Sequence, residues 1–323
     1  MQQVELFTYL IFDFLIVKES LLEINPGISE VIRLIIAVAL LFPMVVFTLH
    51  PRWLSRSGIV STVSFELLYG LIIITGLRAL HSSDASHSLG FLPQSMKGFY
   101  GSYGGILLMF SGHAIYPSVF SELKDKRDMF RVLNYTYALI SILSIPVALV
   151  VILGYGRESV TDLPTGYLEE GTIENWVGQV FMILKGCFTH PAILYPIVKE
   201  TSQSIHTHFF SQNSHKTVTA QNILDIEGQI FDSNAMTTPS IKLKIVVSLV
   251  ISTLAMFGSM FIPSIAFVLS LSSAIFAITL NLTLPSLTFA ICMPKNDYPI
   301  RARVAIILCF LGLVSSVVAF MGL

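Results

Sequence analysis

The segment FSGHAIYP, residues 110–117, places polar and helix-breaking residues inside a run that is otherwise apolar. Gly112 permits the backbone to leave a helix, and Pro117 cannot donate a helical hydrogen bond to the carbonyl of residue 113. Backbone groups freed at bilayer depth cost several kcal/mol each unless protein, water or a substrate satisfies them. In transporters, such breaks bind the charged groups of a substrate.

The expected substrate-binding residues are Phe110, Ser111, Gly112, His113, Ala114 and Tyr116. The alternative for this segment is a merely kinked helix that packs against its neighbours.

Two charged residues lie deep inside other apolar runs. Lys185 lies ~14 Å inside the run 176–198, and Glu66 lies ~12 Å inside the run 58–79, measured from the opposite side. A charge at such a depth costs about 3 kcal/mol unless it is paired or faces water. Glu66 and Lys185 are therefore expected to form either a structural ion pair or a coupling site whose protonation changes during transport. Both interpretations stay open.

Two further titratable residues lie in apolar runs. His190 points away from Lys185 on the same predicted helix, and we expect it to pack against a neighbouring helix rather than to relay protons. Asp13 lies in the short run 4–17 and is a secondary candidate for coupling, because its depth is not defined.

The composition identifies an integral membrane protein. Hydrophobic residues make up 54% of the chain and charged residues only 12%, with a mean hydropathy of +0.75. The net charge of −1 and the absence of a long basic cluster argue against a nucleic-acid partner. The loops contain no set of a nucleophile with a neighbouring base, so the sequence does not predict an enzyme. It also implies no cofactor. The histidines His206, His208 and His215 are expected in a solvated loop rather than in a metal site.

The apolar runs predict one all-α transmembrane domain over 1–323. Taking about 20 residues per crossing, we expect spans near 31–49, 58–79, 98–120, 132–154, 176–198, 243–263, 264–292 and 302–322, and a partial span at 4–17. The segment 199–242 is expected to be a loop. Most Lys and Arg residues lie in alternate connections, which places the N-terminus of this chain and the loop 199–242 on the cytoplasmic side.

Three segments carry a resemblance to the amino acid/auxin permease family. The segment FSGHAIYPSVFSELKD resembles the family's sixth helix, and VFMILKGCFTHPAILYPIVKE resembles the eighth helix of the branch that contains vesicular GABA/glycine and vacuolar amino acid transporters. A third segment, from Leu254 to Pro294, resembles the ninth and tenth helices. The resemblance implies a leucine-transporter-like inverted-repeat helix bundle. Aligned in this way, the chain begins inside the third helix, so an N-terminally truncated bundle that lacks the first two helices is expected.

The resemblance implies proton-coupled secondary active transport of small or neutral amino acids by alternating access, with sodium as the less favoured coupling ion. The expected location is a vesicular, vacuolar or lysosomal membrane. The alternatives are a truncated, non-transporting regulatory or amino-acid-sensing membrane protein, and a proton/amino acid symporter of the plasma membrane. The expected partners are an amino acid, protons and the lipid bilayer.

Overall fold

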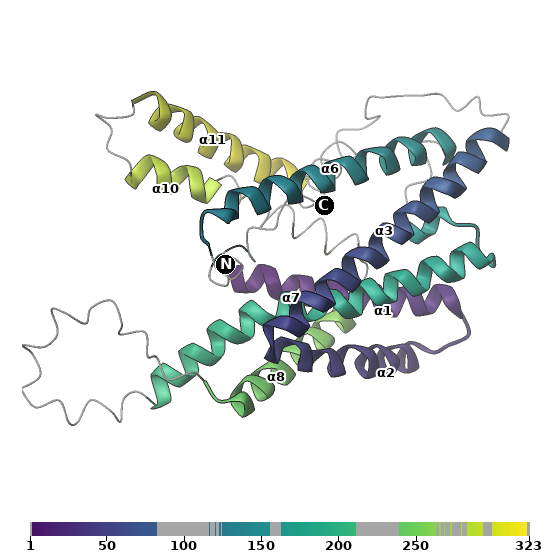
Figure 1. Cartoon of the computed structure of the whole chain (residues 1–323), viewed down its shortest axis with the longest axis horizontal. Helices are drawn as coiled ribbons and strands as arrows, with labels where there is room; N and C mark the ends of the chain where they lie inside the picture. Colours follow the sequence, from purple (N-terminus) through teal and green to yellow (C-terminus); the bar gives the residue numbers. More distant parts are fainter. Residues whose placement is uncertain are drawn as a thin grey trace, which may run out of the picture.

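The computed structural model describes residues 2–82, 125–155, 163–210, 239–262, 283–292 and 299–321, and single positions at 116, 120, 123, 265, 268, 272 and 279. These ranges are helical and contain no strand. Figure 1 labels α1 (Gln2–Ile24), α2 (Glu30–Leu41), α3 (Pro51–Ser82), α6 (Asp128–Tyr155), α7 (Ile173–Phe210), α8 (Ile241–Phe261), α10 (Leu284–Cys292) and α11 (Pro299–Met321). Short 3-10 helices cover Phe42–Leu49 (η1) and Pro164–Tyr167 (η2).

Five helices in the described ranges are long and apolar enough to cross a bilayer. They are Glu30–Leu49, Arg52–His81, Asp128–Tyr155, Ile173–His208 and Ile241–Phe261. The structure thus confirms the all-α polytopic membrane class. Four of the expected spans, 31–49, 58–79, 132–154 and 176–198, lie within these helices, and 243–263 overlaps the fifth. Nearly all of the expected span 98–120 and most of 264–292 lie outside the described residues.

Several helices, among them α1 and α7, extend past the bounds expected from the apolar runs. α1 covers 23 residues rather than 4–17, a length of about 34 Å at 1.5 Å per residue. Its charged end finds partners, because Lys18 Nζ lies 3.3 Å from Glu30 Oε1 and 3.8 Å from Glu19 Oε1.

α7 continues to Phe210, so residues 199–210 of the expected loop 199–242 are helical. Neither Gly nor Pro interrupts these positions. Thr207 Oγ1 also donates to the carbonyls of Gln203 and Ser204, a bond that keeps a short polar side chain within the helix. Residues 211–238 lie outside the described part of the chain.

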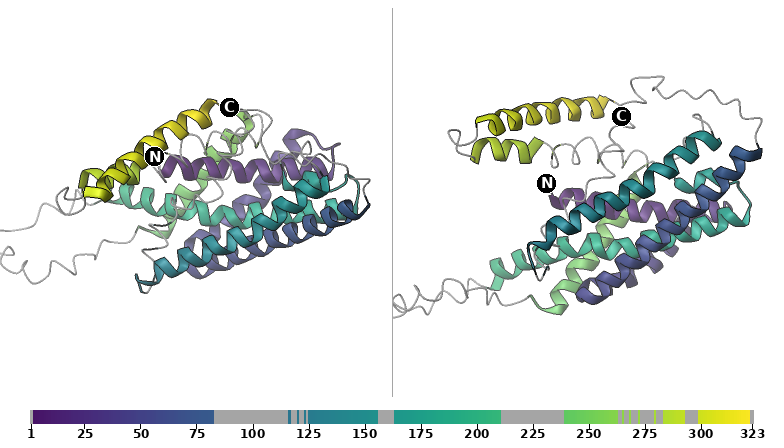
Figure 2. Two further views of the ribbon diagram at one scale, coloured as in Figure 1. Left: turned by 90° about the horizontal axis from the view of Figure 1, so that it is seen from above. Right: turned by 45° about the horizontal axis from the view of Figure 1, so that its top comes forward.

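α1 is the most enclosed helix of the bundle. It packs against α7, α8 and α2, while α7 also packs against α3, and α6 lies along α3 (Figure 2). Leu10, Phe14 and Ile16 of α1 have no exposed surface, and neither have Leu68 of α3 and Leu194 of α7. A helix buried on all sides can carry polar groups that face protein rather than lipid.

Glycines bring neighbouring helices close to each other. A Cβ atom added to Gly186 of α7 would lie 3.3 Å from Val17 Cγ2 and 3.6 Å from the Asp13 carbonyl oxygen of α1. A Cβ atom added to Gly154 of α6 would lie 2.5 Å from the Gly76 carbonyl oxygen of α3. At Gly154 the two backbones therefore approach more closely than a larger residue would allow, whereas the contacts at Gly186 are close to ordinary van der Waals distances.

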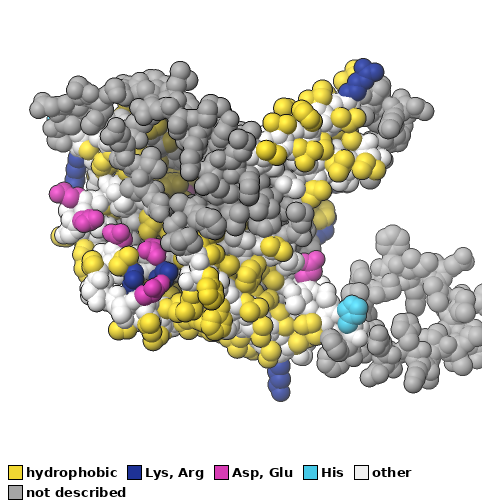
Figure 3. Space-filling model, turned by 180° about the vertical axis from the view of Figure 1, so that it is seen from behind, with side chains coloured by type: hydrophobic (Ala, Val, Ile, Leu, Met, Phe, Trp, Pro, Cys, Tyr) yellow, Lys and Arg dark blue, Asp and Glu magenta, His cyan; other side chains and the backbone are white. Residues whose placement is uncertain are grey.

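Apolar side chains cover much of the described outer surface, as Figure 3 shows, and most acidic side chains visible in this view lie on its left side. The exposed apolar residues include Ile35, Leu67, Ile142 and Val246, each at least half exposed. Exposure of this extent has a simple cause in a membrane protein, because lipid tails cover such surfaces.

Candidate functional site

A buried row of polar side chains connects three helices. Asp13 of α1 places Oδ2 3.5 Å from Nδ1 of His190 on α7. The other ring nitrogen of His190, Nε2, lies 3.2 Å from Oγ of Ser252 on α8. All three residues are fully buried. Carboxyl, imidazole and hydroxyl thus lie in one line across the interface of α1, α7 and α8.

The local sequence explains how this row is held. Phe14 follows Asp13 and packs its ring edge-on against the His190 ring, with 5.6 Å between the ring centroids. Gly186 lies one turn before His190 and faces Val17 and the Asp13 carbonyl of α1. Pro191 follows His190 and has no N–H to donate to the carbonyl of Cys187.

The carboxyl group of Asp13 is incompletely satisfied. Both of its oxygens, and Nδ1 of His190, are buried without a hydrogen bond of good geometry in the described structure. A separation of 3.5 Å is longer than a normal hydrogen bond. A buried carboxylate without hydrogen bonds is unfavourable, and protonation or a nearby positive charge relieves that cost.

Lys185 supplies such a charge. Its side chain extends between α1 and α3, with Nζ 5.2 Å from the ring centre of Phe12 and 5.9 Å from that of Phe65. Asp13 and Lys185 are close enough for an electrostatic interaction, although they form no direct ion pair in the described structure. Aromatic faces and a carboxylate together stabilise a cation inside a low-dielectric bundle.

The backbone around Lys185 also bonds to polar side chains. Its carbonyl oxygen accepts hydrogen bonds from Thr189 Oγ1 at 2.7 Å and from Ser61 Oγ at 3.3 Å, and the two hydroxyls lie 2.5 Å apart. Ser61 belongs to α3, so these bonds connect α3 to α7 at the level of the lysine.

The structure does not bring Glu66 and Lys185 together as an ion pair. Phe65 of α3 faces the lysine, and Glu66 is the next residue, about 100° further around the helix. Glu66 is partly exposed and forms no ion pair within the described residues. The acidic side chain that acts on Lys185 is Asp13 instead.

Most of the predicted substrate-binding residues, Phe110 to Ala114, lie outside the described residues. Tyr116 is described, and its hydroxyl shares a hydrogen bond with the hydroxyl of Tyr137 on α6. Among the histidines of the expected loop, His206 and His208 lie in the last turns of α7, and His215 lies outside the described residues. No group of metal-binding side chains occurs in the described ranges.

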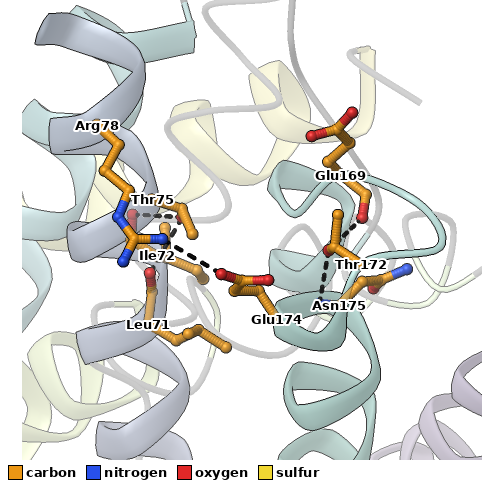
Figure 4. Close-up of polar contacts among 8 residues, drawn as sticks. All are labelled: Leu71, Ile72, Thr75, Arg78, Glu169, Thr172, Glu174 and Asn175. Atoms are coloured by element: carbon orange, nitrogen blue, oxygen red, sulfur yellow. Dashed lines mark hydrogen bonds and ion pairs between the residues drawn. The ribbon is translucent and has the colours of Figure 1, made fainter. Parts of the chain in front are cut away.

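One end of the bundle is held by polar contacts between α3 and α7 (Figure 4). Arg78 Nη1 donates to Glu174 Oε1 at 3.2 Å. Thr172 precedes α7, and its Oγ1 accepts a hydrogen bond from the Asn175 N–H at 3.2 Å, which caps the helix. At the same end, outside the apolar part of α1, burial and the charges of Glu170 and Glu19 raise the pKa of Glu23.

An acid, a histidine and a serine that contact each other in this order, as Asp13, His190 and Ser252 do, also make up the catalytic triad of hydrolases. Nucleophilic catalysis, however, needs a hydroxyl that a substrate can reach, and Ser252 has no exposed surface. What this set can do without such access is to take up, hold and release a proton.

Comparison with known proteins gives one family match. The model of the family described as transmembrane amino acid transporter protein matches residues 1–323. A search of curated proteins finds no match.

Proposed function

The chain belongs to the transmembrane amino acid transporter family, and from that premise we propose that it carries small or neutral amino acids across an organelle membrane by proton-coupled secondary active transport. Amino acid transport and a multi-pass membrane location follow from the family. The family consists of transporters rather than enzymes, which agrees with the expectation that the chain catalyses no reaction.

The observation that supports proton coupling is the contact between the titratable side chains of Asp13 and His190 inside the bundle, with Lys185 on the same interface of α1 and α7. Ionisable side chains within membrane helices are costly and belong to ion pathways and proton relays. Lys185 is one proposed coupling residue. Glu66 is a second one, which acts separately because it does not contact the lysine.

The proposed substrate site is the broken segment formed by Phe110, Ser111, Gly112, His113, Ala114 and Tyr116. Its backbone groups bind the amino and carboxylate groups of the substrate. Rocking of one group of helices against the other then exposes the site to each side in turn, in a leucine-transporter-like bundle. The hydrogen bond between Tyr116 and Tyr137 supports a direct link from this segment to α6.

Protons are favoured over sodium because Asp13 interacts electrostatically with the ammonium group of Lys185. A lysine beside the carboxylate repels a second cation, whereas a proton is taken up by the carboxylate or the imidazole itself. The proposed location is a vesicular, vacuolar or lysosomal membrane with residue 1 on the cytoplasmic side. The plasma membrane is the alternative.

The test is uptake of radiolabelled amino acids by the purified chain in proteoliposomes. An imposed pH gradient is expected to drive accumulation, and a protonophore is expected to abolish it. A sodium gradient at equal pH serves as the comparison. Substrate binding without uptake under either gradient would overturn the proposal and favour the amino-acid-sensing alternative.

Glu66→Gln tests the second coupling residue in the same assay. We expect the pH dependence of uptake to flatten, because the glutamine cannot take up a proton. A pH profile that matches the wild type would remove Glu66 from the mechanism.

A further inference from the structure

We propose that Asp13 and His190 together bind the coupling proton, with Ser252 orienting the imidazole and Lys185 acting as the movable counter-charge. This inference rests on the proposed proton-coupled transport and assigns it a site. The site joins α1, α7 and α8, so its protonation state affects the contact of three helices at once.

The proton balance of the pair follows from its geometry. A neutral imidazole carries one N–H and one lone pair. Where Nε2–H donates to Ser252, the lone pair of Nδ1 faces Oδ2 of Asp13 at 3.5 Å, and two electron-rich atoms then lie opposite each other. In the other tautomer, Nδ1–H points at Oδ2 and Ser252 donates to Nε2, so the ionised pair still carries one negative charge. One added proton removes that charge. It forms either a carboxylic acid O–H that points at Nδ1 or an imidazolium N–H that points at the carboxylate.

The surroundings decide which cation can bind here. From α7, the titratable groups that face Asp13 are His190, Lys185 and Cys187. α8 contributes the uncharged Ser252. α2 carries its charges, Glu30 and Arg33, in its first turn, and Glu30 bonds to Lys18 rather than to Asp13. A ring nitrogen and an ammonium are poor surroundings for sodium, which requires several oxygen ligands, but they suit a proton.

Proton binding changes what holds α1 against α7. With Asp13 ionised, the carboxylate attracts Lys185 and the two helices are drawn together. With the proton bound, the Asp13–His190 pair has no net charge in either form, so the attraction on the ammonium weakens and the rings of Phe12 and Phe65 become its main partners. The proton thus switches an electrostatic contact between two helices, as alternating access requires.

The test is gradient-driven accumulation in proteoliposomes with the membrane potential held at zero. One coupled proton and a gradient of one pH unit give about tenfold accumulation. For Asp13→Asn and His190→Gln, we expect the ratio of accumulation with the gradient to that without it to fall to about one. A variant that transports more slowly both with and without the gradient keeps this ratio, so the ratio reports coupling rather than general activity. A wild-type ratio in either folded variant would overturn the inference.

Two matched controls accompany these variants. Glu5→Gln removes another fully buried carboxyl group from α1, one whose Oε1 accepts a hydrogen bond from Tyr9. Ser248→Ala removes a buried hydroxyl of α8 that bonds to the Lys244 carbonyl and not to His190. Both controls are expected to keep the wild-type ratio, and a loss of the ratio in both would contradict the special role of Asp13 and His190.

A second measurement separates this inference from the proposed function. Thermal unfolding of the purified chain in detergent is followed between about pH 5 and pH 8, where histidine changes charge. The difference in Tm between the wild type and Asp13→Asn is expected to change with pH, and that between the wild type and Glu5→Gln to stay constant. A constant difference for Asp13→Asn would overturn the inference even in a chain that transports. If the wild type shows no gradient-driven uptake, the proposed coupling is overturned, and with it the role of the pair as the coupling site; a pH-dependent difference in Tm would then show proton binding by the pair alone.

Discussion

Asp13 of α1 and His190 of α7 face each other across 3.5 Å, between Oδ2 and Nδ1, in a part of the bundle where neither side chain has exposed surface. Such a contact is unfavourable unless the charges on its two sides balance. Lys185, which Asp13 attracts, provides that balance from the same helix as His190. The three residues therefore form one electrostatic unit, and changes within it should not be additive.

A double-mutant cycle measures this unit. Lys185→Met alone leaves a buried carboxylate without its counter-charge, so we expect it to lower the Tm of the purified chain. Asp13→Asn combined with Lys185→Met should recover part of this loss. The expected coupling is about 0.5–3 kcal/mol, the range for residues of one charged network. Additive effects of the two changes would show that Asp13 and Lys185 do not interact.

Two glycines offer a matched test of helix packing. A Cβ atom at Gly154 would meet the carbonyl oxygen of Gly76 at 2.5 Å, and a backbone atom cannot turn aside as a side chain can. We expect Gly154→Ala to destabilise the chain by about 1–3 kcal/mol through separation of α3 and α6. Gly70→Ala meets nothing within 4 Å and should stabilise by about 0.5–1 kcal/mol through helix propensity.

Thermal unfolding of both glycine variants in the same detergent gives the comparison. A Gly154→Ala chain as stable as Gly70→Ala would mean that α3 and α6 do not approach each other at these glycines.

The membrane-spanning helices could be predicted from the sequence because their signal is local. The length of an apolar run and the need to satisfy every backbone hydrogen bond in lipid suffice to place them. The apolar run predicts α1 only over 4–17, since the end of the helix carries Lys18 and Glu19. Those charges find partners in the fold, and no count of apolar residues along the chain reveals that.

The buried pair could not be predicted, because it depends on which helix faces which. The sequence suggested Glu66 as the partner of Lys185 from the similar depths of the two residues. The depth of a residue defines its level in the membrane, but it does not say towards which neighbouring helix its side chain points. The fold turns Phe65 rather than Glu66 towards the lysine. The sequence contains only a weak signal for this pair: Asp13 is a carboxyl group in an apolar run, and His190 directly precedes Pro191.

The broken segment is tested by substitution of its glycine. Gly112→Leu adds a bulky side chain where the proposed site needs an open backbone, so we expect substrate binding to be lost while membrane insertion is kept. Binding of a labelled amino acid to the purified chain measures this effect. Gly70→Leu adds the same side chain at an open position of α3 and serves as the control. Binding by the Gly112→Leu chain at the wild-type level would contradict the proposed substrate site.

The environment of Glu23, at one end of the bundle, predicts that the stability of the chain depends on pH. Burial, with the charges of Glu170 and Glu19, raises its pKa, so the folded chain holds this proton more tightly than the unfolded chain does. Stability from this group is therefore fully present at low pH and is lost as the pH rises through the raised pKa. Glu23→Gln, which cannot ionise, should raise the Tm at neutral pH and leave it unchanged at a pH below the ordinary pKa of a glutamate.

The control for this change is Arg78→Gln, which breaks the exposed pair with Glu174 at the same end. Removing an exposed ion pair changes stability by at most about 1 kcal/mol, so this variant should lower the Tm only slightly at neutral pH. The two variants thus shift the Tm in opposite directions, although each removes one charge. A Glu23→Gln chain that is less stable than the wild type at neutral pH would mean that the Glu23 carboxylate is stabilised where it lies, against the repulsion expected from Glu170 and Glu19.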